Sequence, residues 1–329
     1  MSDRAVGALA AALVAAIFGS AYVATALQLR GFTPLGGALW RSGIASIILV
    51  LLSSWMVARH RKAHAATRSS PPPMVGRLAR LLILGLLGGF IFIVGMNLAV
   101  SRVGATVTAF VAGLYAILAA LFAPAFLPET LDWRAVVGLA VAMLGTILLA
   151  ELGPTGDPLG LVAAGAAAVS FGLFLVLIRR WSAAIQVGPV GISLATALAS
   201  TAGLVILIAV MEPNAALPFS ASASVVLATI WLAFVTTTGP LLTTVALRRV
   251  EASLAASLLL LNPITATALA ALLLNEPPSP TQIFGGLLVL LGMAVATDPI
   301  GVVRRWREAA RKESSDPHTI DIGSSRRMQ

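Results

Sequence analysis

Ten stretches of the chain are apolar and long enough to cross a lipid bilayer as helices, which takes about 20 residues. Each is a continuous apolar run, without the alternation of apolar and polar residues that the strands of a membrane barrel need. We therefore predict an all-α integral membrane protein with ten transmembrane helices. The predicted spans are residues 5–27, 34–57, 78–100, 104–127, 133–152, 158–178, 188–210, 224–246, 251–274 and 280–299.

The composition excludes a single soluble domain. Of the 329 residues, 58% are hydrophobic and only 11% are charged, whereas a soluble domain carries about 25% charged residues. The chain has no cysteine, which excludes disulfides and thiolate metal sites. His60 and His64 have a spacing that could chelate a metal on a helix, but a solvated basic loop is the favoured interpretation. Because no histidine lies at membrane depth, we predict no enzymatic activity, no cofactor and no metal.

The positive charges predict the orientation of the chain. With the N-terminus in the cytoplasm, 19 of the 22 lysines and arginines lie on the cytoplasmic side, most of them in the loop 58–77 and the tail 300–329. Only Arg30 and Arg102 lie outside, and Arg41 lies within a span. Since cytoplasmic loops are enriched in lysine and arginine, both termini are predicted to be cytoplasmic in a bacterial inner membrane. The net charge of +9 then reflects topology, and no nucleic-acid partner is predicted.

The sequence contains an internal repeat. When residues 101–145 are shifted by 147 positions, Arg102 meets Arg249, Glu129 meets Glu276, and two glycines of the fifth span meet two of the tenth. The first and sixth spans align similarly at a shift of 153. Because each unit has five helices, an odd number, the second unit is predicted to enter the membrane inverted. We therefore divide the chain into a first repeat (1–152), a second repeat (153–299) and a basic cytoplasmic tail (300–329), part of it disordered.

Two segments resemble a known family. The run IFGSAYVATALQLRGFTPLGGALWRSG and the run LNPITATALAALLLNEPPSPTQIFGGLLVLLGM are similar to EamA-type members of the drug/metabolite transporter superfamily. The sequence departs from the family pattern at Phe18, where tryptophan is usual, and at Ala116, where a proline matching Pro263 is expected. The resemblance implies ten helices in two repeats and transport of small metabolites such as amino acids. Such inverted repeats expose a site at the middle of the membrane alternately to each side.

Residues that interrupt or polarise the spans are the candidates for the solute site. Pro240 and Pro263 each remove a backbone donor within a predicted helix, so we expect kinks or hinges there. Polar and aromatic side chains within the spans are expected to replace the hydration of a solute, although each could instead only satisfy helix packing. The predicted substrate-binding residues are Ser20, Tyr22, Asn97, Tyr115, Phe171, Thr237 and Asn262.

Charged residues near the spans leave alternatives open. The Arg41 guanidinium is expected to snorkel to the interface or to bind backbone carbonyls, and the functional alternative is a contact with an anionic group of the substrate. Glu129 and Glu276 occupy equivalent turns and could cap the following helices or form gate-like ion pairs. No acidic residue lies deep within a span, so proton coupling has no support.

The prediction is therefore a metabolite permease, most readily an exporter of amino acids or similar solutes, whose partners are the solute and the lipid bilayer. A non-transporting membrane subunit or sensor and a lipid flippase remain as alternatives. The sequence does not determine the oligomeric state, and a closed bundle of ten helices can work as a monomer.

Overall fold

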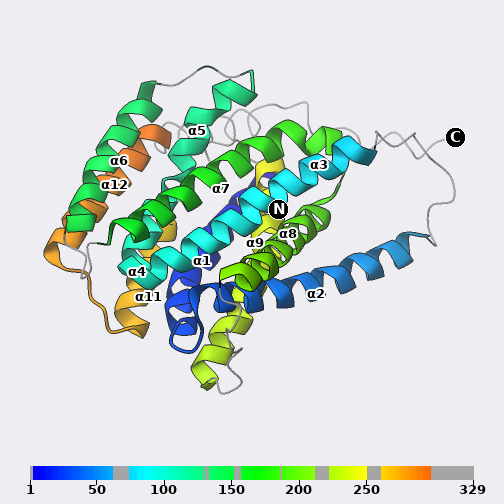
Figure 1. The fold of residues 1–329 in the computed structure, drawn as a ribbon. Helices are drawn as coiled ribbons and strands as arrows, with labels where there is room; N and C mark the ends of the chain where they lie inside the picture. Colours follow the sequence, from blue (N-terminus) through cyan, green and yellow to red (C-terminus); the bar gives the residue numbers. More distant parts are fainter. Residues whose placement is uncertain are drawn as a thin grey trace, which may run out of the picture.

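The computed structural model describes residues 3–61, 74–128, 130, 133–151, 157–185, 187–211, 222–249 and 261–297. Throughout these residues the regular secondary structure is helical, and the helices pack into one bundle (Figure 1). The elements are α1 (Asp3–Gln28), α2 (Pro34–Arg61), α3 (Met74–Gly85), η1 (Leu86–Ile91), α4 (Phe92–Gly113), α5 (Tyr115–Phe126), α6 (Trp133–Glu151), α7 (Pro158–Ile185), α8 (Pro189–Met211), α9 (Ala223–Arg249), α11 (Leu261–Leu273) and α12 (Pro280–Thr297).

Five apolar helical runs in the described part of the chain are long enough to cross a membrane, and four shorter apolar helices accompany them. Helices thus lie in the predicted spans, and the all-helical class is confirmed. The first part of the predicted ninth span, 251–260, lies outside the described residues, as do most of the basic loop and the tail 300–329. The number of ten transmembrane helices therefore stays a prediction.

The predicted third and fourth spans form one long helical run, Val75–Phe126, which changes direction at Gly104. Gly104 has φ +80° and ψ 171°, a conformation that side chains with a Cβ rarely adopt. The run is irregular at two further places. One is η1, a single turn of π-helix, and the other is Leu114, which separates α4 from α5. The sequence has no proline at either place, so these two breaks were not predicted.

Glycines allow α6 and α12 to pack with their backbones in contact, and Figure 1 shows the two helices side by side at one edge of the bundle. A Cβ on Gly138 would collide with the carbonyl of Gly292, and one on Gly145 would lie 2.5 Å from the carbonyl of Gly285. Moving along α6 from Gly138 to Gly145, the contacted residue moves backwards along α12 from Gly292 to Gly285, so α6 and α12 run antiparallel. These are the glycines that the internal repeat aligns with one another.

A second pair of contacts repeats the same relation. A Cβ on Gly172 of α7 would lie 3.1 Å from the carbonyl oxygen of Tyr115 and 3.2 Å from the Cβ of Leu118. A Cβ on Gly19 of α1 would lie 2.6 Å from the carbonyl oxygen of Asn262, the position equivalent to Tyr115. It would also lie 2.7 Å from the Cβ of Thr265, the position equivalent to Leu118. The contact of Gly19 with α11 is therefore equivalent to the contact of Gly172 with α5, under the shifts of 153 and 147 residues that align the two repeats.

An ion pair joins the turn after the third predicted span to the start of α7. Arg102 Nη1 lies 2.6 Å from Asp157 Oδ2, and Asp157 Oδ1 accepts a hydrogen bond of 2.9 Å from the Leu159 backbone N–H. The hydrogen bond from Arg102 is the main reason why the pKa of the Asp157 carboxyl lies below its usual value. The pair links the two repeats at one end of the bundle.

Asp157→Asn should remove this ion pair while keeping the cap of α7, because asparagine caps a helix as well as aspartate does. A carboxyl with a lowered folded-state pKa stabilises the fold above its unfolded pKa, about 3.9, and this contribution is lost as pH falls through the lower folded value. We expect a small decrease in melting midpoint at pH 7 that disappears on acidification below about pH 4. A decrease that stays constant down to pH 3 would contradict the assignment; melting curves of both proteins in detergent measure it.

Candidate functional site

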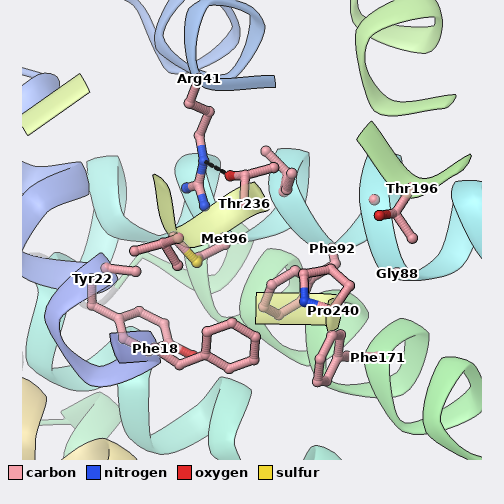
Figure 2. A pocket seen from close by; sticks show the side chains of 14 residues that line it. Phe18, Tyr22, Arg41, Gly88, Phe92, Met96, Phe171, Thr196, Thr236 and Pro240 are labelled. Atoms are coloured by element: carbon pink, nitrogen blue, oxygen red, sulfur yellow. Dashed lines mark hydrogen bonds between the residues drawn. The ribbon is translucent and has the colours of Figure 1, made fainter. Parts of the chain in front are cut away.

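A cavity lies at the centre of the bundle, and helices of both repeats line it (Figure 2). Its volume is about 30 Å³, which is room for about two water molecules, so a solute would need the lining helices to move apart. The walls are mostly apolar. The first repeat contributes Phe18, Tyr22, Arg41, Gly88, Phe92 and Met96, and the second contributes Phe171, Thr196, Thr236 and Pro240.

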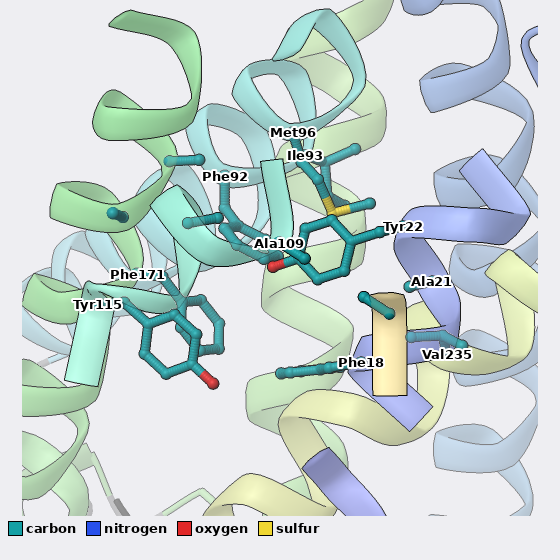
Figure 3. Close-up of a cluster of buried hydrophobic side chains, with 14 of the residues drawn as sticks. Phe18, Ala21, Tyr22, Phe92, Ile93, Met96, Ala109, Tyr115, Phe171 and Val235 are labelled. Atoms are coloured by element: carbon teal, nitrogen blue, oxygen red, sulfur yellow. The ribbon is translucent and has the colours of Figure 1, made fainter. Parts of the chain in front are cut away.

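Phe171 of α7 is the centre of an aromatic cluster at this cavity. Its ring centroid lies 4.6 Å from that of Phe92, and 5.0 Å and 5.8 Å from those of Tyr115 and Phe18, in edge-on contacts. Figure 3 shows Tyr115 beside Phe171 on one side, with Phe18 and Tyr22 opposite. Phe18, where the resemblance leads us to expect tryptophan, supplies a ring to the cluster. The rings give the cavity a rigid wall suited to an apolar or aromatic body.

Arg41 is buried in this apolar setting. Its side chain is 2% exposed, and its Nε donates a hydrogen bond of 3.0 Å to the Thr236 hydroxyl of α9. Its Nη1 is buried without a hydrogen-bond partner. The snorkelling interpretation requires the guanidinium to extend to the surface. Instead, it points into the cavity from one end (Figure 2). This position fits the two other predicted roles, a structural clamp and a contact with an anionic group; the polar partner seen for Nε is a hydroxyl and not a backbone carbonyl.

Buried polar atoms without partners gather where the two repeats have equivalent positions. The Tyr115 hydroxyl and both polar atoms of the Asn262 amide have no partner within 3.5 Å at hydrogen-bonding geometry, and both residues are at most 1% exposed. The Asn262 amide faces the phenols of Tyr22 and Tyr115. Asn97 Nδ2 donates to the Ile93 carbonyl at 2.8 Å, while its Oδ1 has no partner. Buried unsatisfied groups are costly, so this set is a candidate for solute contact.

Other predicted residues lie away from the cavity lining. The Ser20 hydroxyl donates to the Ile17 carbonyl at 2.7 Å and accepts from the exposed Trp231 indole at 2.8 Å, which joins α1 to α9. The Thr237 hydroxyl donates to the Ala233 carbonyl at 2.8 Å, and its neighbour Thr236 takes the place at the cavity. The structure thus brings Tyr22, Phe171 and Arg41 together at the cavity. The other predicted residues are not part of its lining: Ser20, Asn97, Tyr115, Thr237 and Asn262.

The two prolines predicted as hinges both lie within helices, and of the two glutamates predicted as caps or gates the structure describes one. Pro240 lies inside the continuous helix α9 and lines the cavity, and Pro263 lies in the first turn of the described part of α11. Glu276 is in the exposed turn before α12, whose N-terminus is capped by reciprocal hydrogen bonds between Ser279 and Gln282. Glu129 lies outside the described residues.

Gly88 and Gly89 of η1 are lining residues that the sequence reasoning missed. A Cβ on Gly88 would lie 2.5 Å from the Phe174 ring, and one on Gly89 would collide with the Thr196 carbonyl. The Ser170 hydroxyl donates to the Leu87 carbonyl at 2.5 Å, inside the π-helical turn. The repeat gives no signal for this pair, because its two shifts align Gly88-Gly89 with Val235-Thr236 or with Leu241-Leu242.

Among the residues that the structure describes, no group of three or more histidine, aspartate or glutamate side chains forms a candidate metal site. The arrangement is therefore one of shape, aromatic contact and a few directed polar groups. Such a site is suited to binding a solute.

Comparisons with known proteins agree with this architecture. The sequence profile described as the EamA-like transporter family matches residues 5–150 and 158–297, once over each repeat. Protein PecM of Dickeya dadantii (strain 3937) is 30% identical over 166 residues, which cover 50% of this chain and 50% of PecM, so the match spans about half of that relative. One crystal structure superposes with a TM-score of 0.60 at 21% identity, covering 92% of this chain and 98% of the other. That similarity concerns the fold alone.

Proposed function

Because the chain belongs to the EamA-like transporter family, a family of multi-pass membrane proteins, we propose that it is a permease that moves small solutes through the central cavity. The observation that carries the proposal is the cavity between the two repeats, into which the buried Arg41 points with an unpartnered Nη1. Tyr115, which packs against the lining residue Phe171, and Asn262 add buried polar atoms behind this lining. A purely structural bundle would bury such atoms against partners or replace them with apolar groups.

The proposed mechanism is alternating access by two repeats of inverted orientation, with the domain boundaries at 152 and 299. Two structural relations support it. The equivalent helices α6 and α12 run antiparallel through their glycine contacts, as repeats related by an axis in the membrane plane require. Equivalent contacts also join Gly19 to Asn262 and Gly172 to Tyr115. Two similar halves of this kind can exchange conformations and open the same site to either side.

The proposal also covers the membrane in which the protein lies, the orientation of its termini and the direction of transport. We propose a bacterial inner membrane with both termini in the cytoplasm, on the strength of the distribution of lysine and arginine. Export of amino acids or similar amphipathic solutes is the transport activity to test first. Catalysis is not part of the proposal.

The test is flux of a mixed metabolite pool across proteoliposomes that hold the purified full chain, read by mass spectrometry with and without a pH gradient. We expect selected solutes to cross faster than in empty vesicles. Equal rates for a folded, inserted protein would contradict the permease; labelled lipid would then test the flippase alternative, and failure of both would favour the subunit or sensor.

The double substitution Tyr115→Ala and Asn262→Ala should reduce this flux at least tenfold, since it removes polar groups from both equivalent positions. Arg30→Gln is the matched control, because Arg30 is exposed at a helix end. Unchanged flux in a stably inserted double variant would show that the site lies elsewhere.

A further inference from the structure

Arg41 is a buried positive charge, and no acidic side chain is buried among the residues that the structure describes. Arginine does not lose its proton in proteins, so the guanidinium is a fixed cation at 2% exposure. Its one described polar contact is with the neutral Thr236 hydroxyl, and Nη1 has no partner. None of the described residues that line the cavity is acidic, and no aspartate or glutamate of the sequence lies deep within a predicted span.

A lone cation at membrane depth is unfavourable, because the hydrocarbon does not replace its hydration. Buried charges are therefore normally paired. An occupant with one negative charge would make the cavity neutral. A zwitterion would leave one net positive charge there, and a cation would leave two. The electrostatics of the empty cavity therefore select for an anion.

The shape of the site adds the second half of the argument. Phe92, Phe171 and Phe18 form a continuous aromatic wall, and Figure 2 shows Arg41 at the opposite end of the cavity from these rings. A guanidinium binds carboxylates by parallel, charge-assisted hydrogen bonds. The rings favour a flat apolar body by edge-on or offset contact.

We propose that the solute class of this site is the amphipathic organic monoanion: a carboxylate, held by Arg41, carried on an aromatic or similarly apolar body. This inference rests on the proposed function and narrows it. It predicts that amino acids bind more weakly than the corresponding acids without an amino group, because the ammonium group finds no carboxylate among the described residues of the cavity lining. Thr236 is a positioning residue that orients the guanidinium through Nε.

The test uses three probes with one common body and different charge: 3-phenylpropionate as the anion, phenylalanine as the zwitterion and phenethylamine as the cation. Binding to the purified full chain in detergent at pH 7.5 is measured by titration calorimetry. We expect the anion to bind at least tenfold more tightly than either of the other two. Equal or tighter binding of the zwitterion or the cation, or binding of none of the three, would overturn the inference.

Variants of Arg41 separate a specific contact from general attraction. Arg41→Gln should weaken binding of the anion at least tenfold, the loss expected for a charge-assisted hydrogen bond, and should not weaken binding of the cation. Arg30→Gln removes a positive charge from an exposed position and should change neither. Unchanged anion binding in a folded Arg41→Gln protein would overturn the inference.

Two further variants keep the inference testable if Arg41→Gln does not fold. Arg41→Lys keeps the charge but loses the planar fork, so the preference for the anion should remain with weaker affinity. Thr236→Val removes the hydrogen bond to Nε and should weaken anion binding alone. Loss of the anion preference in Arg41→Lys, or no effect of Thr236→Val, would overturn it. The flux of the metabolite pool decides the proposed function separately, since transport of zwitterions or cations would refute this inference and leave the permease intact.

Discussion

Replacing Gly19 with alanine is expected to destabilise the protein by about 2 kcal/mol or more, although alanine is the better helix former by about 1 kcal/mol. The new methyl group would lie 2.6 Å from the Asn262 carbonyl oxygen and 2.7 Å from the Cβ of Thr265. Real Cβ atoms do not approach other atoms so closely, and a backbone carbonyl cannot rotate away as a flexible side chain can. Helices α1 and α11 would have to separate at the contact that lies next to the cavity.

The measurement is the unfolding midpoint of the purified variant in detergent, compared with a graded series on α7. Gly172→Ala, whose Cβ would lie 3.1 Å or more from its neighbours, should be destabilised less than Gly19→Ala. Gly165→Ala meets nothing within 4 Å and should be neutral or more stable, because alanine favours the helix. If all three variants melt alike, the close approach at Gly19 is not what holds these helices together.

The sequence alone was sufficient for the helical class and the two repeats because both depend on information that is local or periodic. A long apolar run must become a helix in lipid, and the shifts of 147 and 153 residues can be read by alignment. The change of direction at Gly104 falls at the predicted boundary between the third and fourth spans, whereas the break at Leu114 and the turn η1 were not predicted, since no proline marks them. Such breaks depend on which neighbour approaches a glycine, as Thr196 approaches Gly89.

Some of the side chains around the candidate cavity were singled out by the sequence, and others were not, for a related physical reason. Composition and position indicated that Tyr22, Tyr115 and Asn262 were unusual in lipid, and all three are buried near one another. The choice between Thr236 and Thr237 depends on a rotation of about 100° around the axis of α9, which the sequence did not settle. The burial of Arg41 depends on α9 lying across α2, a tertiary contact that no local pattern encodes.

Asn262→Leu is expected to separate stability from transport. Both polar atoms of the amide are buried without a partner, and each such group is unfavourable by about 1–3 kcal/mol. Leucine has no polar group to leave unsatisfied, so the variant should melt at the same temperature as the wild type or at a higher one. If the amide binds solute, flux in proteoliposomes should nevertheless fall at least tenfold, the effect of losing one or two hydrogen bonds to the solute.

Thr201→Val provides the control. The Thr201 hydroxyl donates to the Ala197 carbonyl at 2.9 Å and lies 3.0 Å from the Ser46 hydroxyl. Loss of these hydrogen bonds should lower the melting midpoint and leave the flux of solutes unchanged. A lower melting midpoint together with normal flux for Asn262→Leu would reverse the assignment and make the amide a structural group. The combination expected here, a stable protein without transport, arises only if the fold retains an unfavourable polar group for the sake of its ligand. Natural proteins keep such groups at functional sites, where a loss of stability is offset elsewhere in the structure.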